Sequence, residues 1–247
     1  MYRNKHIGIT YATVINIPTD YSTIQEGIQN SVNGDTVLVQ PGIYTETVDF
    51  EGRSIVVGSL YISTFDTSYI SQTIIDGNHS GRCVNFYTNE DSEAILIGLT
   101  IRNGHSNFGS GIFISNSDPT LENLVIRNNS ATLGAGILMA DHSNPTIINS
   151  TIINNITEDS GGGLYCGENS NPLIDGLLIE GNSAEWGGRI FCDHASPTIS
   201  NSIITGNTAI RGGGIWLQNE SNPIITYSDM SMGTLNYTGR GHFQNAP

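Results

Sequence analysis

The clearest pattern in the chain is a triplet of small residues followed by a segment in which apolar residues alternate with others. It occurs five times, and the first aliphatic residue after the triplet recurs at intervals of 25, 27, 26 and 25 residues. A period of this length indicates a repeat architecture, and the alternation indicates strands with one buried face. These aliphatic residues are Ile112, Ile137, Leu164, Ile190 and Ile215.

Two further markers keep the same period. A proline recurs 26, 27, 25 and 26 residues apart, and an asparagine that ends the next apolar segment recurs 26, 27 and 25 residues apart. Three markers in one register predict that the repeats stack as coils of a parallel β-helix, about 4.8 Å apart, with right-handed connections. We expect one strand after each glycine triplet and a second strand between the proline and the asparagine. The markers are Pro119, Pro145, Pro172, Pro197 and Pro223, and Asn129, Asn155, Asn182 and Asn207.

Stacking turns each repeat position into a column. The aliphatic residue after the triplet is expected to face the core, and the four asparagines are expected to form an inward amide ladder between coils. The intervening residue then points outward, which predicts a mostly aromatic outer column. Opposite strand parity, which would bury the rings and expose two cysteines, is the less favoured alternative. The outer column is Phe113, Leu138, Tyr165, Phe191 and Trp216.

The N-terminal part is predicted to close one end of the β-helix. Residues 22–32 read as a short amphipathic helix, with a capping box at Ser22 and Gln25 or at Thr23 and Glu26. Ile24, Ile28 and Val32 share one face of that helix, which we expect to cover the first coil. We expect a poorly ordered lead-in over 1–17, followed by one domain over 18–247. Within that domain, early strands are expected at 36–39, 47–50, 54–57, 73–75 and 83–86. Regular coils are expected over 93–230, and an irregular tail over 231–247.

Composition narrows the classes of partner. The net charge is −14 and Lys5 is the one lysine, so we expect no nucleic-acid partner. No apolar segment of about 18 residues is present, so we expect no transmembrane segment. The segment 7–12 is compatible with the end of a trimmed signal peptide. Of the three cysteines, Cys166 and Cys192 are expected to stack as buried free thiols, with a disulfide as the alternative.

The repeat phrases Gly161-Gly162-Gly163-Leu164-Tyr165-Cys166 and Asn144-Pro145-Thr146-Ile147, with Ile17-Pro18-Thr19-Asp20-Tyr21-Ser22-Thr23-Ile24-Gln25 near the start, resemble the right-handed parallel β-helix superfamily that includes pectate lyases. They are most similar to its secreted, repeat-rich members. The resemblance covers about residues 14–230. It implies an all-β, single-stranded right-handed β-helix with an N-terminal capping helix. It also implies that the protein is secreted or located on a bacterial cell surface. The motifs are specific for the fold rather than for a reaction.

The bend before each proline is acidic. Stacked coils are expected to bring Asp141, Glu168 and Asp193 within about 5 to 10 Å of one another. Carboxylates at such distances serve as acid and base in glycosidases, and oxygen clusters bind Ca²⁺. The neighbouring His142 and His194 are candidate bases. The alternative is that these residues belong to solvated bends with no chemical role.

Arg189 interrupts one glycine triplet, beside Trp186. The resemblance implies that a lyase of this fold would use an arginine or lysine base next to an acid-neutralising Ca²⁺, and Arg189 is the best match. The lyase and polygalacturonase motifs themselves are not recognisable here. The alternative is a surface arginine stacked on a ring.

Two functional hypotheses follow. In the first, the protein binds polysaccharide or a cell-surface glycan along its aromatic and acidic side, and as an enzyme it would be a polysaccharide lyase or glycoside hydrolase. In the second, it is a non-catalytic adhesion or self-assembly module that associates through the aromatic column or the helix ends. Ordinary ring stacking, or cover by a loop or the tail, would also account for the column.

Overall fold

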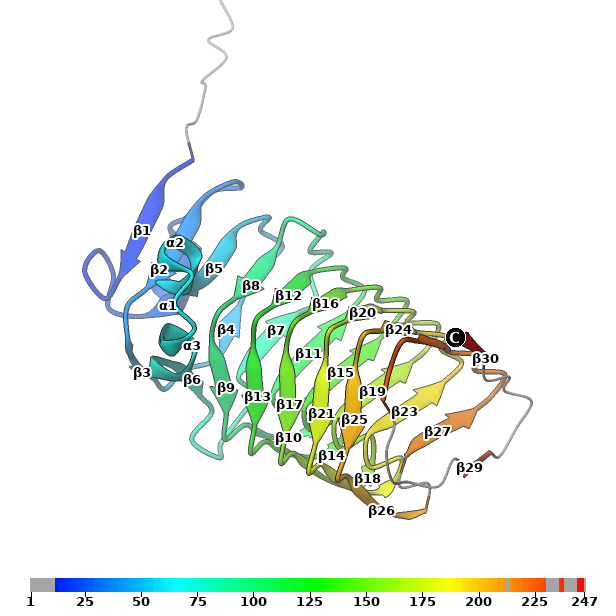
Figure 1. The fold of residues 1–247 in the computed structure, drawn as a ribbon. Helices are drawn as coiled ribbons and strands as arrows, with labels where there is room; N and C mark the ends of the chain where they lie inside the picture. Colours follow the sequence, from blue (N-terminus) through cyan, green and yellow to red (C-terminus); the bar gives the residue numbers. More distant parts are fainter. Residues whose placement is uncertain (1–11, 212–213, 230–235, 238–243, 247) are drawn as a thin grey trace, which may run out of the picture.

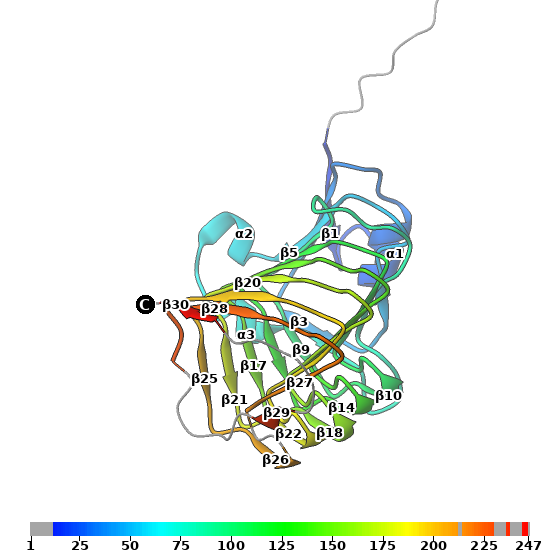
Figure 2. The ribbon, with the colours of Figure 1, turned by 90° about the vertical axis from the view of Figure 1, so that its right-hand side faces the viewer.

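The computed structural model describes residues 12–211, 214–229, 236–237 and 244–246. The chain winds as a solenoid in which each strand pairs in parallel with the equivalent strand of the next coil (Figure 1). Four sheets run along the solenoid, and we name them A, B, C and D. Figure 2 shows them arranged around the axis, with sheet A across the top, sheet B at the left and sheet D at the lower end.

The sheets contain 10, 7, 8 and 5 strands in the order A to D. Sheet A consists of β1 (Val14–Ile17), β2 (Thr36–Val39), β5 (Val56–Ser59), β8 (Ile95–Ile97), β12 (Thr120–Glu122), β16 (Thr146–Ile148), β20 (Leu173–Asp175), β24 (Thr198–Ser200), β28 (Ile224–Thr226) and β30 (Gln244–Ala246). Sheet B consists of β3 (Gly42–Tyr44), β6 (Thr73–Asp76), β9 (Thr100–Arg102), β13 (Val125–Arg127), β17 (Thr151–Ile153), β21 (Leu178–Glu180) and β25 (Ile203–Thr205).

Sheet C carries the strands that open after the glycine triplets. It consists of β4 (Val48–Asp49), β7 (Val84–Phe86), β11 (Ile112–Ser115), β15 (Ile137–Ala140), β19 (Leu164–Gly167), β23 (Ile190–Asp193), β27 (Ile215–Gln218) and β29 (Asn236–Tyr237). Sheet D consists of β10 (His105–Phe108), β14 (Ser130–Leu133), β18 (Ile156–Ser160), β22 (Ser183–Trp186) and β26 (Thr208–Arg211).

Each regular coil therefore has four strands, where the sequence predicted two. The predicted strand between proline and asparagine is split, because one residue at its centre adopts a left-handed conformation: Asn123 with φ 51°, Asn149 with φ 48° and Gly176 with φ 68°. Asparagine and glycine tolerate this conformation, so the chain turns sharply from sheet A to sheet B. The strands of sheet D follow the ladder asparagines and were not predicted.

The four asparagines form the predicted ladder inside the solenoid. Asn155 donates from Nδ2 to Asn182 Oδ1 at 3.0 Å and to the carbonyl of Ile126 at 3.0 Å. Its own Oδ1 accepts from the backbone and the side chain of Asn129, both at 3.0 Å. Asn182 repeats this pattern with Asn207. Each buried amide is thus satisfied by its neighbouring coils, which fixes the spacing and register of the stack.

The aliphatic column faces the core as expected. Ile112, Ile137 and Leu164 are completely buried, and so are Cys166 and Cys192, which are aligned across β19 and β23. Cys83, Cys166 and Cys192 are free thiols. A hydrogen bond with Cys166, burial and the nearby negative charge raise the pKa of Cys192.

The N-terminal end differs in detail from the prediction. The helix is α1 (Ile24–Gln29), shorter than 22–32, and its capping box uses Thr23 and Glu26. Ile24 and Ile28 are buried against the first coils, whereas Val32 lies beyond the helix and is 52% exposed. Within the predicted lead-in, β1 pairs with β2, so 14–17 is ordered; residues 1–11 lie outside the described part.

Two further segments were not predicted. Helices α2 (Tyr61–Thr64) and α3 (Ser68–Gln72) lie on the outside of the corner between sheets A and B, where Thr100 donates to the carbonyl of Ile70 at 2.7 Å (Figure 2). In the tail predicted to be irregular, β29 and β30 extend sheets C and A. Other tail residues lie outside the described ranges. Among the residues described, no helix has the length and apolarity needed to cross a membrane.

Candidate functional site

The outer face of sheet C carries the predicted column. Phe113, Leu138, Tyr165, Phe191 and Trp216 are aligned from strand to strand across β11, β15, β19, β23 and β27. The parity of the strands is the favoured one, because the flanking Ile112 and Ile114 are in the core. The same column continues toward the N-terminus as Asn85 and Asp49.

The column is not the open stripe that the sequence predicted. Leu138, Phe191 and Trp216 are only 4 to 5% exposed, while Phe113 and Tyr165 are half-buried. The turn that leads from sheet D into sheet C folds over the column. A Cβ atom placed on Gly161 would lie 3.0 Å from the Cβ of Tyr165, and one on Gly187 would lie 3.0 Å from that of Trp216. Trp186 from sheet D packs edge-on against Trp216, with ring centroids 4.8 Å apart.

Tyr165 is the point where the aromatic column meets the acidic bends. Its ring stacks on Phe191 with centroids 5.1 Å apart and an interplanar angle of 11°. Burial, together with the negative charges of Asp193 and Glu168, raises the pKa of its hydroxyl to about 12. The phenol therefore stays protonated and lies among carboxylates that can accept a hydrogen bond.

The three predicted acidic residues lie on adjacent coils, and two of them are in direct contact. The carboxyl groups of Asp141 and Glu168 are hydrogen-bonded across adjacent coils, and the Ser115 hydroxyl donates to Asp141. The Ser115 bond and the Glu168 bond lower the pKa of Asp141. The bond with Asp141, partial burial and the charges of Asp141 and Asp193 raise the pKa of Glu168. Of the two carboxyl groups, Glu168 therefore holds a proton more tightly than Asp141 does.

Asp193 lies on the next coil beside this pair: its carbonyl accepts from the backbone nitrogen of Glu168 at 3.1 Å, but no hydrogen bond joins its carboxyl group to theirs among the described residues. It aligns with Gly167, one position before Glu168, and Asn219 donates to it at 2.6 Å. The Nδ1 atom of the exposed His194 lies 3.0 Å from the carboxylate of Asp193. His142 is exposed next to Asp141. Across the described ranges, no group of three or more His, Cys, Asp or Glu side chains is placed to hold a metal ion, so calcium binding stays a prediction.

Arg189 is not on the surface, and this corrects the alternative of a surface arginine stacked on a ring. It is 1% exposed and is the largest of the fully buried side chains. The equivalent Gly163 explains why, since a Cβ there would approach Ile179 and Asn182 in the interior. Burial lowers the pKa of Arg189. The arginine stacked on Trp186 is instead Arg211, with its guanidinium carbon 4.6 Å from the ring centroid.

Comparison with known proteins agrees with this architecture. A family model described as "Right handed beta helix region" matches residues 135–238. A pectin methylesterase from Yersinia enterocolitica superposes with a TM-score of 0.53 at 12% identity, covering 91% of this chain and 90% of the esterase. The pectate lyase Pel9A superposes with a TM-score of 0.51 at 16% identity, covering 90% of this chain and 64% of the lyase. No curated protein matched the sequence.

The fold is a right-handed parallel β-helix. This confirms the predicted fold class. At 12 to 16% identity, the two solved structures establish the fold of this β-helix and nothing about its reaction.

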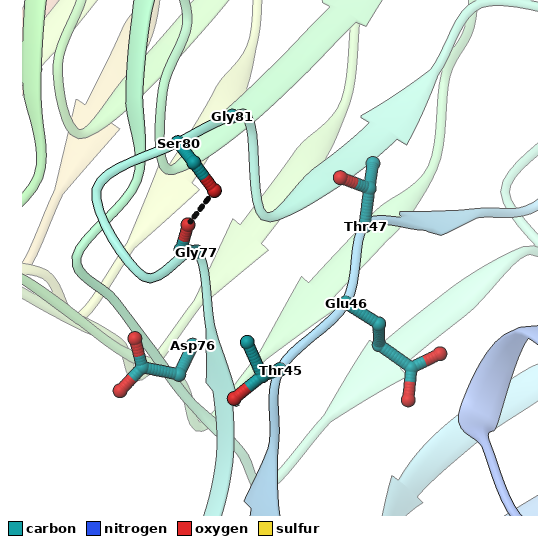
Figure 3. Close-up of a pocket in the computed structure, with 7 residues that line it drawn as sticks. All are labelled: Thr45, Glu46, Thr47, Asp76, Gly77, Ser80 and Gly81. Atoms are coloured by element: carbon teal, nitrogen blue, oxygen red, sulfur yellow. Dashed lines mark hydrogen bonds between the residues drawn. The ribbon is translucent and has the colours of Figure 1, made fainter.

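The β-helix also has a shallow pocket of about 110 Å³ near its N-terminal end, which the sequence did not indicate (Figure 3). Glu46 and Asp76 line it, but both carboxylates already have partners. Glu46 accepts from the backbone nitrogens of Ile24 and Gln25 at the start of α1, and Asp76 forms an ion pair with Arg102 at 2.7 Å. Glycines and hydroxyl residues complete the lining: Thr45, Thr47, Gly77, Ser80 and Gly81. Both carboxylates in the pocket therefore serve to hold neighbouring segments of the chain together.

Proposed function

We propose that this β-helix binds polysaccharide on the outer face of sheet C, at Tyr165 and the adjoining acidic bends. The observation that carries the proposal is the half-buried Tyr165 ring, held flat on Phe191 beside the carboxyl groups of Glu168 and Asp193. Aromatic faces pack against the apolar faces of sugar rings, while carboxylates accept hydrogen bonds from sugar hydroxyls. The pectin- and pectate-acting enzymes of similar fold support a glycan as the partner.

The negative charge of the protein indicates which kind of glycan it can bind. With a net charge of −14 and acidic bends beside the ring, the site repels a uniformly anionic polymer. We therefore propose a largely neutral polysaccharide. The proposed location is outside the cell or at its surface, where such a polymer is found.

Glycoside hydrolysis is the second candidate function, because the carboxyl groups of Asp141 and Glu168 are hydrogen-bonded and the pKa of Glu168 is the raised one. A carboxyl group that keeps its proton next to an ionised partner can act as a general acid. Glu168 would take that role, whereas the lyase mechanism based on Arg189 has no support, because Arg189 is buried.

The binding proposal is tested by affinity electrophoresis through gels containing a panel of neutral polysaccharides. Tyr165→Ala is expected to weaken binding about tenfold or more, and Tyr165→Phe is expected to retain it. Tyr227→Ala is the matched control, since Tyr227 is an exposed aromatic residue on a different bend. Absence of binding to every polymer, or equal binding by Tyr165→Ala, would overturn the proposal.

The hydrolytic version is tested by measuring new reducing ends between pH 4 and 8. Glu168→Gln is expected to reduce the rate about a hundredfold or more, because it removes the general acid. Arg189→Met is the control and is expected to retain activity. If neutral polymers are bound but never cleaved, the protein is a binding module. Sedimentation at several concentrations then tests the self-assembly alternative.

A further inference from the structure

Arg82 lies at the N-terminal end of the same face and is fixed in place. Its Nε donates to the carbonyl of Phe108 at 2.7 Å, and its guanidinium carbon lies 4.0 Å from the centroid of the Phe113 ring. The protein has 23 acidic residues and 9 lysines and arginines, yet Arg82 forms no ion pair within the described ranges. The Nη side of its guanidinium group therefore retains its capacity to bind an anion.

Asn85 is the outer-column neighbour of Phe113, the residue on whose ring Arg82 is stacked. It is aligned with Phe113 on one side and with Asp49 on the other. Its side chain faces outward, because Val84 and Phe86 on either side are in the core. Asn85 is 8% exposed, and its Oδ1 atom is buried without a hydrogen-bond partner. An unsatisfied buried acceptor destabilises the fold, and a donor from a ligand would satisfy it.

Tyr87 and Asp49 complete the surroundings. The Tyr87 hydroxyl is hydrogen-bonded to the Asp49 carboxylate, and this bond raises the pKa of Tyr87. The two groups are therefore each other's hydrogen-bond partners. The exposed ring of Tyr87 stands on the bend that follows β7. The unsatisfied groups here are thus one cationic donor and one neutral acceptor.

We infer that Arg82 and Asn85 form a second binding site, for a carboxylate that carries a neighbouring hydroxyl group. A planar carboxylate matches the guanidinium fork, and a hydroxyl supplies the donor that Asn85 Oδ1 lacks. Phe113 and Tyr87 provide ring surface for the carbon skeleton. Sugar acids and smaller hydroxy acids share this chemistry.

If the ligand is a sugar acid at the end of a glycan, the inference rests on the proposed function. Three coil steps, about 14 Å, separate the Asn85 position from Tyr165 along the column. An acidic sugar on Arg82 would anchor a neutral chain that continues along the column to Tyr165. Arg82 would then fix the direction of the glycan, because the Tyr165 end is acidic and rejects the charged unit.

The experiment is a titration of the full chain with glucuronate, lactate, acetate and glucose, monitored by calorimetry and by the Asn85 side-chain amide signal. Glucuronate is expected to bind, whereas acetate and glucose should bind at least about tenfold more weakly. Arg82→Gln and Asn85→Leu should each abolish the preference for glucuronate over acetate and glucose. Arg82→Lys should retain only part of that preference. Arg211→Gln is the matched control, because Arg211 is stacked on Trp186 in the same manner.

Lactate separates the two sources of the ligand. Binding equal to that of glucuronate would identify a site for small hydroxy acids, whereas weaker binding would identify a site for sugar acids. Equal binding of acetate, absence of glucuronate binding, or unchanged binding by a correctly folded Arg82→Gln would overturn the inference. Glucuronate binding without any polysaccharide binding would refute the proposed function while leaving this site intact.

Discussion

At the scale of single residues, similar side chains have different roles according to which way the strand turns them. Asn129, Asn155, Asn182 and Asn207 are buried and satisfied by one another, whereas Asn85 is buried with an unsatisfied oxygen. The first arrangement stabilises the stack, and the second points to a ligand.

Substituting one ladder residue tests its structural importance. Asn155→Ala removes the bonds to Asn182 and Ile126 and leaves Asn129 without its acceptor. We expect a loss of about 3 kcal/mol or more in the free energy of unfolding, measured with urea. Asn207→Ala removes the same number of side-chain hydrogen bonds and should cost about as much. A loss below about 1 kcal/mol at both positions would contradict a stabilising role for the ladder.

The carboxyl pair predicts a defined pH dependence. The raised pKa of Glu168 stabilises the fold at low pH, and this contribution is lost as the pH rises through that pKa. The lowered pKa of Asp141 acts in the opposite sense, and its contribution is lost as the pH falls. Glu168→Gln keeps a donor to Asp141 but cannot ionise. We expect this variant to gain about 0.5 kcal/mol over the wild type at pH 8 and nothing at pH 4, because both groups are largely solvent-exposed.

Urea midpoints at pH 4, 6 and 8 measure this difference. Glu220→Gln, which makes the same substitution on an exposed bend, should show no such trend. A wild type that gains stability over Glu168→Gln as the pH rises would show that the pKa of Glu168 is not raised in the fold.

At the scale of elements, the turn between sheets D and C decides how much of the aromatic column remains accessible. Its glycines adopt positive φ, with Gly161 at 70°, and lie directly against the column. A side chain on these glycines would push the turn away from the rings. The repeated glycine triplet therefore serves the packing of the turn over sheet C.

Gly161→Ala tests this role. The added Cβ would lie 2.7 Å from the carbonyl oxygen of Leu164, so we expect a loss of about 2 to 4 kcal/mol and a Tyr165 ring more accessible to quenchers. Gly34→Ala is the control, since Gly34 also has positive φ but has no atom within 4 Å of the added group. Similar losses in the two variants would show that backbone conformation alone is responsible.

At the scale of the whole molecule, the net charge of −14 affects any binding along the outer face of sheet C. We expect polygalacturonate to bind more weakly than a neutral polysaccharide at about 20 mM salt, and the difference to shrink at about 0.5 M salt, because added ions screen the repulsion. Affinity electrophoresis at the two salt concentrations measures this. Preferential binding of the polyanion at low salt would contradict the charge argument.

The sequence alone determined the repeat, the strand parity, the stacked coils and the asparagine ladder. These follow from periodicity, because a strand alternates its faces every two residues and identical coils align identical positions. Only the tertiary structure decided which outward residues are accessible. The turn from sheet D into sheet C covers Phe191 and Trp216, and Trp186 from sheet D packs against Trp216. Arg189, at a glycine position of the repeat, is buried. The one-position offset that separates Asp193 from the Asp141–Glu168 pair likewise depends on how adjacent bends align, which residue spacing does not specify.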